Sequence, residues 1–104
     1  MIKIKRRCIK CGIIGLSKIH THHITYKPEL TRYLCHKCHG YIGSIDSLAR
    51  IHYKKLFTNK MVRNSDIDNS LRTLMFCHFM ETNSSELSRP NRRQLVKDIL
   101  NRFV

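Results

Sequence analysis

Two CxxC motifs separated by 23 residues predict that the chain folds around a metal ion. They are Cys8-Ile9-Lys10-Cys11 and Cys35-His36-Lys37-Cys38. Two residues between the cysteines allow both thiolates of one turn to bind the same ion, and two such turns complete a tetrahedral shell. The pattern therefore predicts a zinc ion held by Cys8, Cys11, Cys35 and Cys38. Because four thiolates leave no position open for a substrate, this zinc is expected to be structural.

A redox-active dithiol pair or buried free cysteines are the alternatives to zinc. A redox pair requires a thioredoxin-like strand and helix around one motif, and the sequence lacks that pattern. Residues 1–7 are basic and lack the apolar stretch of a secretory signal. We therefore expect an intracellular, cytoplasmic protein, where thiols stay reduced and cysteines favour metal. The fifth cysteine, Cys77, is expected to be buried on a helix.

The positive charge of the chain is large and unevenly distributed. The net charge is +13, and residues 1–60 carry 13 Lys and Arg against two acids, whereas residues 61–104 carry seven against five. A cationic field of this density attracts nucleic acid. An anionic membrane surface is the alternative partner, but we find no basic amphipathic helix, lipidation signal or apolar membrane span. The predicted nucleic-acid contacts are Lys3, Lys5, Arg6, Arg7, Lys10, Lys18, Lys27, Arg32, Lys37, Arg50, Lys54 and Lys55.

The length of 104 residues and the apolar pattern predict a small α+β domain stabilised by zinc. Residues 1–57 are expected to form the zinc-stabilised, nucleic-acid-binding core. Residues 58–65 are polar and are interpreted as a linker. Apolar residues at helical spacing follow, so residues 65–104 are expected to form a C-terminal helical appendage.

Within the first segment, the sequence predicts a hairpin and then helices. β-Branched residues favour a strand over 19–26, Pro28-Glu29 favours a turn, and Tyr33-Leu34 is interpreted as a short strand leading into the second CxxC motif. One helix is predicted from Cys38 to about Gly43. A second helix is predicted to begin directly afterwards, with Ser44 as its N-cap.

Histidines lie on both sides of the second motif. His22 and His23 fall in the predicted strand, where neighbouring side chains point to opposite faces, so one can bind a metal while the other faces a substrate. His39 follows Cys38 and is held near the hairpin by the zinc. The set suits phosphodiester hydrolysis, in which a divalent cation polarises a phosphoryl oxygen and a neutral imidazole takes a proton from water.

Taken together, these residues resemble the zinc-containing HNH endonucleases over about residues 8–43. The resemblance is carried by the CxxC motifs, by His22-His23-Ile24 with the nearby Pro28-Glu29, and by Leu34-Cys35-x-x-Cys38-His39. It implies a ββα-metal fold, in which two strands and a helix hold a catalytic cation. It also implies that His22 and His39 bind that cation, Mg²⁺ or Mn²⁺, that His23 is the general base, and that the four cysteines hold the family's structural zinc.

Two positions depart from the family pattern. Leu30 stands where the family usually has an asparagine that braces the loop, and Gly43 stands where many members have a further histidine. Such supporting residues hold catalytic groups in place. We favour a metal-dependent HNH-type endonuclease that cuts DNA, because His22, His23 and His39 are all present. The alternative is a catalytically inactive HNH-like zinc module that binds structured RNA, such as a small ribosomal protein binding rRNA, which the charge and both departures favour.

Overall fold

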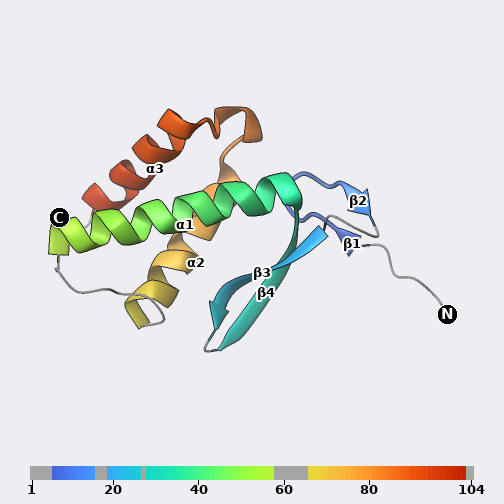
Figure 1. Ribbon diagram of the computed structural model, residues 1–104, viewed down its shortest axis with the longest axis horizontal. Coiled ribbons are helices and arrows are strands. Elements are labelled where there is room, and N and C mark those ends of the chain that lie inside the picture. The colour runs from blue at the N-terminus through green and yellow to red at the C-terminus, as the bar shows by residue number, and fades with distance from the viewer. Residues whose placement is uncertain (1–5, 16–18, 27, 58–65, 103–104) are drawn as a thin grey trace.

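Two antiparallel hairpins precede three α-helices in the part of the chain that the structure describes (Figure 1). The computed structural model describes residues 6–15, 19–26, 28–57 and 66–102. The elements are β1 (Arg6–Arg7), β2 (Ile14–Gly15), β3 (Ile19–Tyr26), β4 (Glu29–Cys35), α1 (His36–Phe57), α2 (Asp66–Glu81), the 3₁₀ turn η1 (Ser84–Glu86) and α3 (Arg89–Asn101). The predicted α+β class is confirmed. No described helix is long and apolar enough to cross a membrane.

The β3–β4 hairpin joins the two CxxC motifs, as the sequence predicts. Its pairing runs from Ile19 opposite Cys35 to Tyr26 opposite Glu29, so β4 is longer than the predicted two-residue strand. The register shifts between His23 and Thr25, which indicates a β-bulge. The turn is stabilised by the Thr25 hydroxyl, which donates a hydrogen bond to the Pro28 carbonyl.

Helix α1 is continuous from His36 to Phe57, so the predicted break at Gly43 and Ser44 is wrong. Ile42, Ile45 and Ala49 are buried at helical spacing, and this apolar face continues across the glycine. A glycine inside a helix costs about 1 kcal/mol, whereas burying one isoleucine side chain contributes about 1.5–3 kcal/mol. Burial therefore outweighs the local preference for a break.

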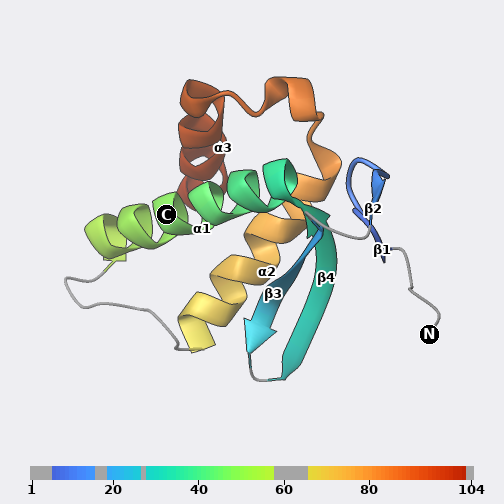
Figure 2. The same cartoon turned by 45° about the vertical axis from the view of Figure 1, so that its right-hand side comes forward.

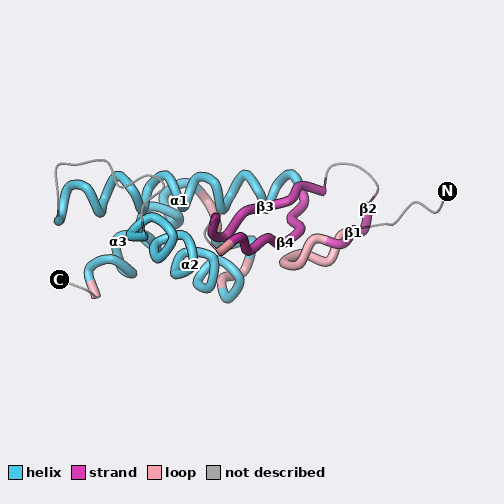
Figure 3. Tube along the Cα trace, turned by 90° about the horizontal axis from the view of Figure 1, so that it is seen from below, coloured by secondary structure: helices cyan, strands magenta, loops and turns pink. Residues whose placement is uncertain are grey.

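One hydrophobic core includes both predicted segments. Leu34 and Ile45 of the first segment belong to the same buried cluster as Phe79 and Val96 of the second. Seen from below, α2 and α3 lie on the same side of α1 (Figure 3). In Figure 2, α2 also lies beside β3. Helix α2 therefore packs against both β3 and α1, and α3 packs against α1. The predicted linker 58–65 lies outside the described residues.

The apolar faces predicted for the last two helices are largely confirmed. On α2, Met75 and Phe79 are fully buried, whereas Ile67 is 41% exposed near the start of the helix. The predicted burial of Cys77 is wrong, because its side chain is exposed. Residue 77 lies two positions from both Met75 and Phe79, which places it on the opposite face of the helix.

Lys10 joins the first CxxC motif to the C-terminal end of α2. Its ammonium group donates hydrogen bonds to the carbonyls of Phe79 and Thr82, and lies 4.6 Å from the centroid of the Phe79 ring. Carbonyls in the last turn of a helix lack partners within the helix and attract a cation. Lys10 was predicted to contact nucleic acid, but the structure places it in this intramolecular contact.

We expect Lys10→Met to lower the free energy of unfolding by about 1–3 kcal/mol, because it removes a charged donor from two carbonyls. Urea denaturation of the zinc-loaded protein measures the change. Lys54→Met is the matched control, since Lys54 is exposed on α1, and it should change stability by less than about 0.5 kcal/mol. Equal effects of the two substitutions would contradict the role assigned to Lys10.

Candidate functional site

The four cysteines of the CxxC motifs form one cluster. Their sulfur atoms all lie within 4.8 Å of one another, and the Sγ atoms of Cys11 and Cys35 are 3.6 Å apart. Two sulfurs bound at about 2.3 Å to one tetrahedral zinc ion are about 3.8 Å apart. The donor set and its spacing therefore fit zinc. Cys8, Cys35 and Cys38 are buried and Cys11 is exposed.

The local backbone explains how the first motif presents its two sulfurs. Gly12 has a φ of +81°, in the left-handed region that favours glycine, and its N–H donates to the Cys8 carbonyl at 2.9 Å. The Ile9 N–H donates to the Tyr33 carbonyl at 2.9 Å, which attaches this turn to β4. Cys35 ends β4 and Cys38 lies in the first turn of α1, so one strand–helix junction supplies the other two sulfurs.

The clustered thiols change one another's acidity. Burial raises the pKa values of Cys38 and Cys11, and the neighbouring sulfurs raise them further. Burial acts in the same direction on Cys8, but hydrogen bonds from backbone groups outweigh it and lower the pKa of that thiol to about 6. Four clustered thiolates repel one another, and a divalent cation offsets this repulsion. Metal binding is therefore coupled to release of protons.

A second, polar site lies between β3, α1 and α2. It is a cavity of about 190 Å³. The residues that line it are Thr21, His22, His23, Tyr26, His39, Gly43, Asp46, Arg50 and Arg72. His22 and His23 were expected to face opposite sides of the strand. Both border this cavity, as does the preceding residue Thr21.

His22 and His39 meet inside the cavity. Their ring centroids are 5.4 Å apart with planes at 71°, and the His22 ring stacks on Phe76 of α2 at 5.9 Å. Burial, followed by repulsion from His39 when that ring is protonated and from Arg72, lowers the pKa of His22 to about 4. Burial and the nearby His20 and His36 also lower the pKa of His39. Both imidazoles are therefore neutral near pH 7, the form that binds cations.

Three residues contact His23. Its Nε2 lies 3.4 Å from Glu29 Oε1, and its ring stacks on Tyr26 at 4.8 Å with planes 5° apart. Arg72 of α2 donates from Nη1 to the His23 carbonyl at 3.1 Å. The Arg72 guanidinium also lies 5.2 Å from the centroid of the Tyr26 ring. Tyr26, Glu29 and Arg72 thus brace the backbone and ring of His23.

Two carboxylates and two arginines form a buried charge network beside the histidines. Arg72 lies 3.7 Å from Asp46 and 3.4 Å from Asp68, and Arg50 lies 3.6 Å from Asp68. Burial raises the pKa of Asp46 to about 7, although Arg72 and Arg50 oppose it. Arg50 was predicted to contact nucleic acid and instead makes this internal ion pair.

Sequence reasoning missed Asp46 and Arg72 as members of the site. Asp46 had a detectable signal, because it is an acid within the apolar stripe of Ile42, Ile45 and Ala49. Arg72 lies 49 positions from His23 and had no local signal.

The other predicted nucleic-acid contacts that the structure describes are exposed. They are Arg6, Arg7, Arg32, Lys37, Lys54 and Lys55. Lys3, Lys5, Lys18 and Lys27 lie outside the described residues. Arg7, Ile9, Thr31, Arg32 and Tyr33 line a groove of about 370 Å³ on β1 and β4. The guanidinium of Arg6 lies 4.9 Å above the Tyr33 ring, so this groove combines positive charge with an exposed aromatic ring.

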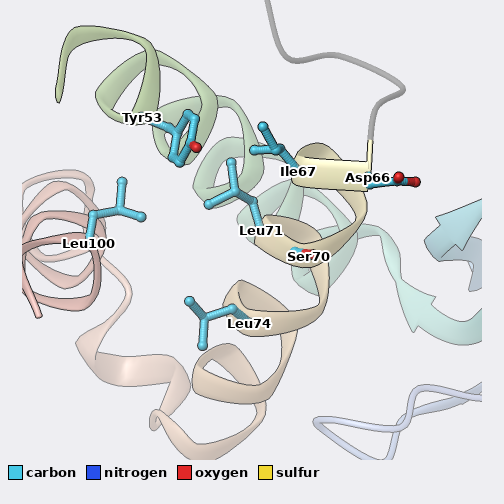
Figure 4. Close-up of a pocket in the computed structure, with 7 residues that line it drawn as sticks. All are labelled: Tyr53, Asp66, Ile67, Ser70, Leu71, Leu74 and Leu100. Carbon is cyan, nitrogen blue, oxygen red and sulfur yellow. The ribbon is translucent and has the colours of Figure 1, made fainter. Parts of the chain in front are cut away.

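A larger pocket lies between the three helices (Figure 4), and no histidine lines it. It has a volume of about 430 Å³, and Leu71, Leu74 and Leu100 point into it. Its lining is mainly apolar, and Asp66 at its edge is its one acidic residue. It offers space for apolar groups but no set of catalytic side chains.

No family model matches this chain, and no curated protein or solved structure matches it either.

Proposed function

We propose that the protein is a metal-dependent nuclease of the HNH type, built on a ββα-metal core that its four-cysteine zinc site stabilises. The observation that carries this proposal is the cavity shared by His22, His23 and His39. These histidines come from one hairpin strand and from the helix that follows the hairpin. The four cysteines join the first CxxC turn to the junction of β4 and α1, where Cys35 pairs with Ile19 at the start of β3.

Each histidine has a distinct role in this proposal. His22 and His39 are neutral at pH 7 and would hold a divalent cation, Mg²⁺ or Mn²⁺. When bound, such a cation polarises a phosphoryl oxygen and stabilises the leaving oxygen. Glu29 beside Nε2 of His23 favours the tautomer with its proton on that nitrogen, which leaves Nδ1 able to accept a proton. His23 would then take a proton from the water that attacks phosphorus as the P–O ester bond breaks.

The groove on β1 and β4 supports binding of a nucleic-acid strand. Arg7 and Arg32 line it and provide sequence-independent contacts to phosphates. Tyr33 is 42% exposed and offers a face on which a base can stack. The zinc-bound turn and β4 connect this groove to the hairpin that carries His22 and His23.

We expect joint replacement of Lys5, Arg6 and Arg7 by glutamine to weaken binding to DNA or RNA. It should reduce the slope of log affinity against log salt by up to about one unit for each phosphate that the variant no longer neutralises. Fluorescence anisotropy over a range of salt concentrations measures this slope. Joint replacement of Arg89, Arg93 and Arg102, which are exposed on or next to α3, removes the same charge and should change the slope less. Equal changes in the two variants would argue against a nucleic-acid site in the N-terminal half.

Cleavage by the zinc-loaded wild-type chain tests the proposed activity. Supercoiled plasmid, linear DNA and structured RNA should each be incubated with the protein in Mg²⁺, Mn²⁺, Co²⁺ or Ni²⁺. We expect nicking of DNA that EDTA abolishes and that His23→Ala, purified in the same way, does not show. Failure to cleave any substrate above the His23→Ala background with every cation would reject the nuclease proposal.

Binding of structured RNA without catalysis is the second candidate. The observation that favours it is the burial of His22, which is 5% exposed and lies against Phe76. A cation and its substrate reach a buried imidazole less easily than an exposed one. Tight, salt-dependent binding to rRNA together with no cleavage in the assay above would favour this candidate.

A further inference from the structure

Residues on one face of helix α1 line the polar cavity, and one of them is a glycine. His39, Gly43 and Asp46 all line the cavity, at the spacing of one helix face. A Cβ added at Gly43 would meet nothing within 4 Å, so this part of the helix borders open space. Many HNH proteins carry a histidine at this place, where this chain has a glycine with open space beside it.

Asp46, the next position on the same face, has an unmatched carboxylate oxygen. Its side chain is 3% exposed, and Oδ2 lies 3.7 Å from Arg72 Nη1. Its Oδ1 is buried and has no hydrogen-bond partner among the residues that the structure describes. A buried acceptor without a partner costs about 1–3 kcal/mol, and more when it is charged. A cation or an ordered water in the cavity would satisfy it.

We propose that Asp46 is a third anchor for the divalent cation that His22 and His39 hold, in place of the ligand absent at Gly43. This inference rests on the proposed function. Among the described residues, the four cysteines are the one group of three or more potential ligands whose donor atoms lie within 4.8 Å of one another. Asp46, His22 and His39 do not form a second such group, so we place a water molecule between Asp46 and the cation. This arrangement suits Mg²⁺ and Mn²⁺ because such cations keep several waters.

The same carboxylate also connects the cation site to the general base. Oδ2 of Asp46 faces Arg72, and Arg72 donates to the carbonyl of His23. A role as counter-ion of Arg72 alone is the simpler explanation of Asp46. A substitution of Asp68 distinguishes the two explanations. Asp68 is fully buried and pairs with Arg72 and Arg50, but it does not line the cavity.

A titration of the zinc-loaded chain with Mn²⁺ tests the proposal. Electron paramagnetic resonance measures the Mn²⁺ that stays free, and so gives the affinity. Asp46→Asn should weaken Mn²⁺ binding by about 10- to 100-fold, the usual effect of removing a supporting group. Asp68→Asn should lower thermal stability without a comparable loss of Mn²⁺ affinity. Adding Gly43→His to Asp46→Asn should restore part of that affinity. Wild-type Mn²⁺ affinity in Asp46→Asn, or an equal loss in Asp68→Asn, would overturn the role of Asp46.

A second measurement needs no variant and so does not depend on how substitutions affect folding. In the wild-type chain, titrated Mn²⁺ should broaden the ¹³C carboxyl resonance of Asp46 before that of Asp68. Equal broadening of both would count against the proposal. If wild-type protein binds Mn²⁺ nowhere near His22 and His39, the proposed nuclease site and the role of Asp46 both fail. If Mn²⁺ binds there and Asp46→Asn changes nothing, only the role of Asp46 fails.

Discussion

Cys38→Ser should release the zinc and unfold the protein. A structural zinc site of four thiolates contributes about 10–16 kcal/mol at pH 7, which is comparable to or larger than the whole stability of a small domain, about 5–15 kcal/mol. The unfolding should not be confined to the hairpins, because Cys38 belongs to the same core as Ile45 and Phe79. Elemental analysis should find one zinc per wild-type chain and none in the variant. Far-ultraviolet circular dichroism should show the disappearance of helix.

Cys77→Ser is the matched control for this substitution. Cys77 is exposed on α2 and is not part of the four-cysteine cluster, so zinc content and helix content should both stay at their wild-type values. A Cys38→Ser protein that remains folded and free of metal would show that the hydrophobic core is sufficient for folding without zinc.

The second large effect is expected from substitutions of the histidines. It distinguishes the proposed base, His23, from the proposed metal ligand, His39. His23→Ala should lower the rate of cleavage by about 10²- to 10⁴-fold, the usual contribution of a general base, and leave Mn²⁺ affinity nearly unchanged. His39→Ala should instead weaken Mn²⁺ binding, so that part of the activity returns at high Mn²⁺. Single-turnover cleavage rates measured across a Mn²⁺ titration distinguish the two variants.

His52→Ala is the control for the histidine variants. His52 is on α1 but is not among the residues that line the cavity, so its removal should leave both rate and Mn²⁺ dependence unchanged. If His23→Ala and His39→Ala behaved alike, the assignment of base and ligand would be wrong even if both residues were needed.

Features that depend on neighbours in the sequence were predictable. Each CxxC motif sets the spacing of its own two sulfurs, and the β-branched residues in 19–26 predict β3 correctly. The break predicted at Gly43 failed because burial of Ile42 and Ile45 on one face outweighs the local preference of a single glycine. Packing was the stronger effect at that position.

Features that depend on contacts between distant residues were not predictable. Lys10 was assigned to nucleic acid from its charge, but it reaches carbonyls about 70 positions away at the end of α2. Arg72 braces His23 from a helix that the family resemblance does not cover. Part of the support of the candidate site is thus supplied by α2, and the packing of α2 against β3 and α1 brings Arg72 there.

We propose that this chain holds two metals in two different environments, one closed and one open to a substrate. Anomalous difference maps from zinc-loaded crystals soaked in Mn²⁺, recorded at the zinc and manganese absorption edges, test it most directly. The account predicts a zinc peak among the sulfurs of Cys8, Cys11, Cys35 and Cys38 and a separate manganese peak between His22 and His39. A zinc peak with no manganese peak in the cavity would contradict the nuclease account.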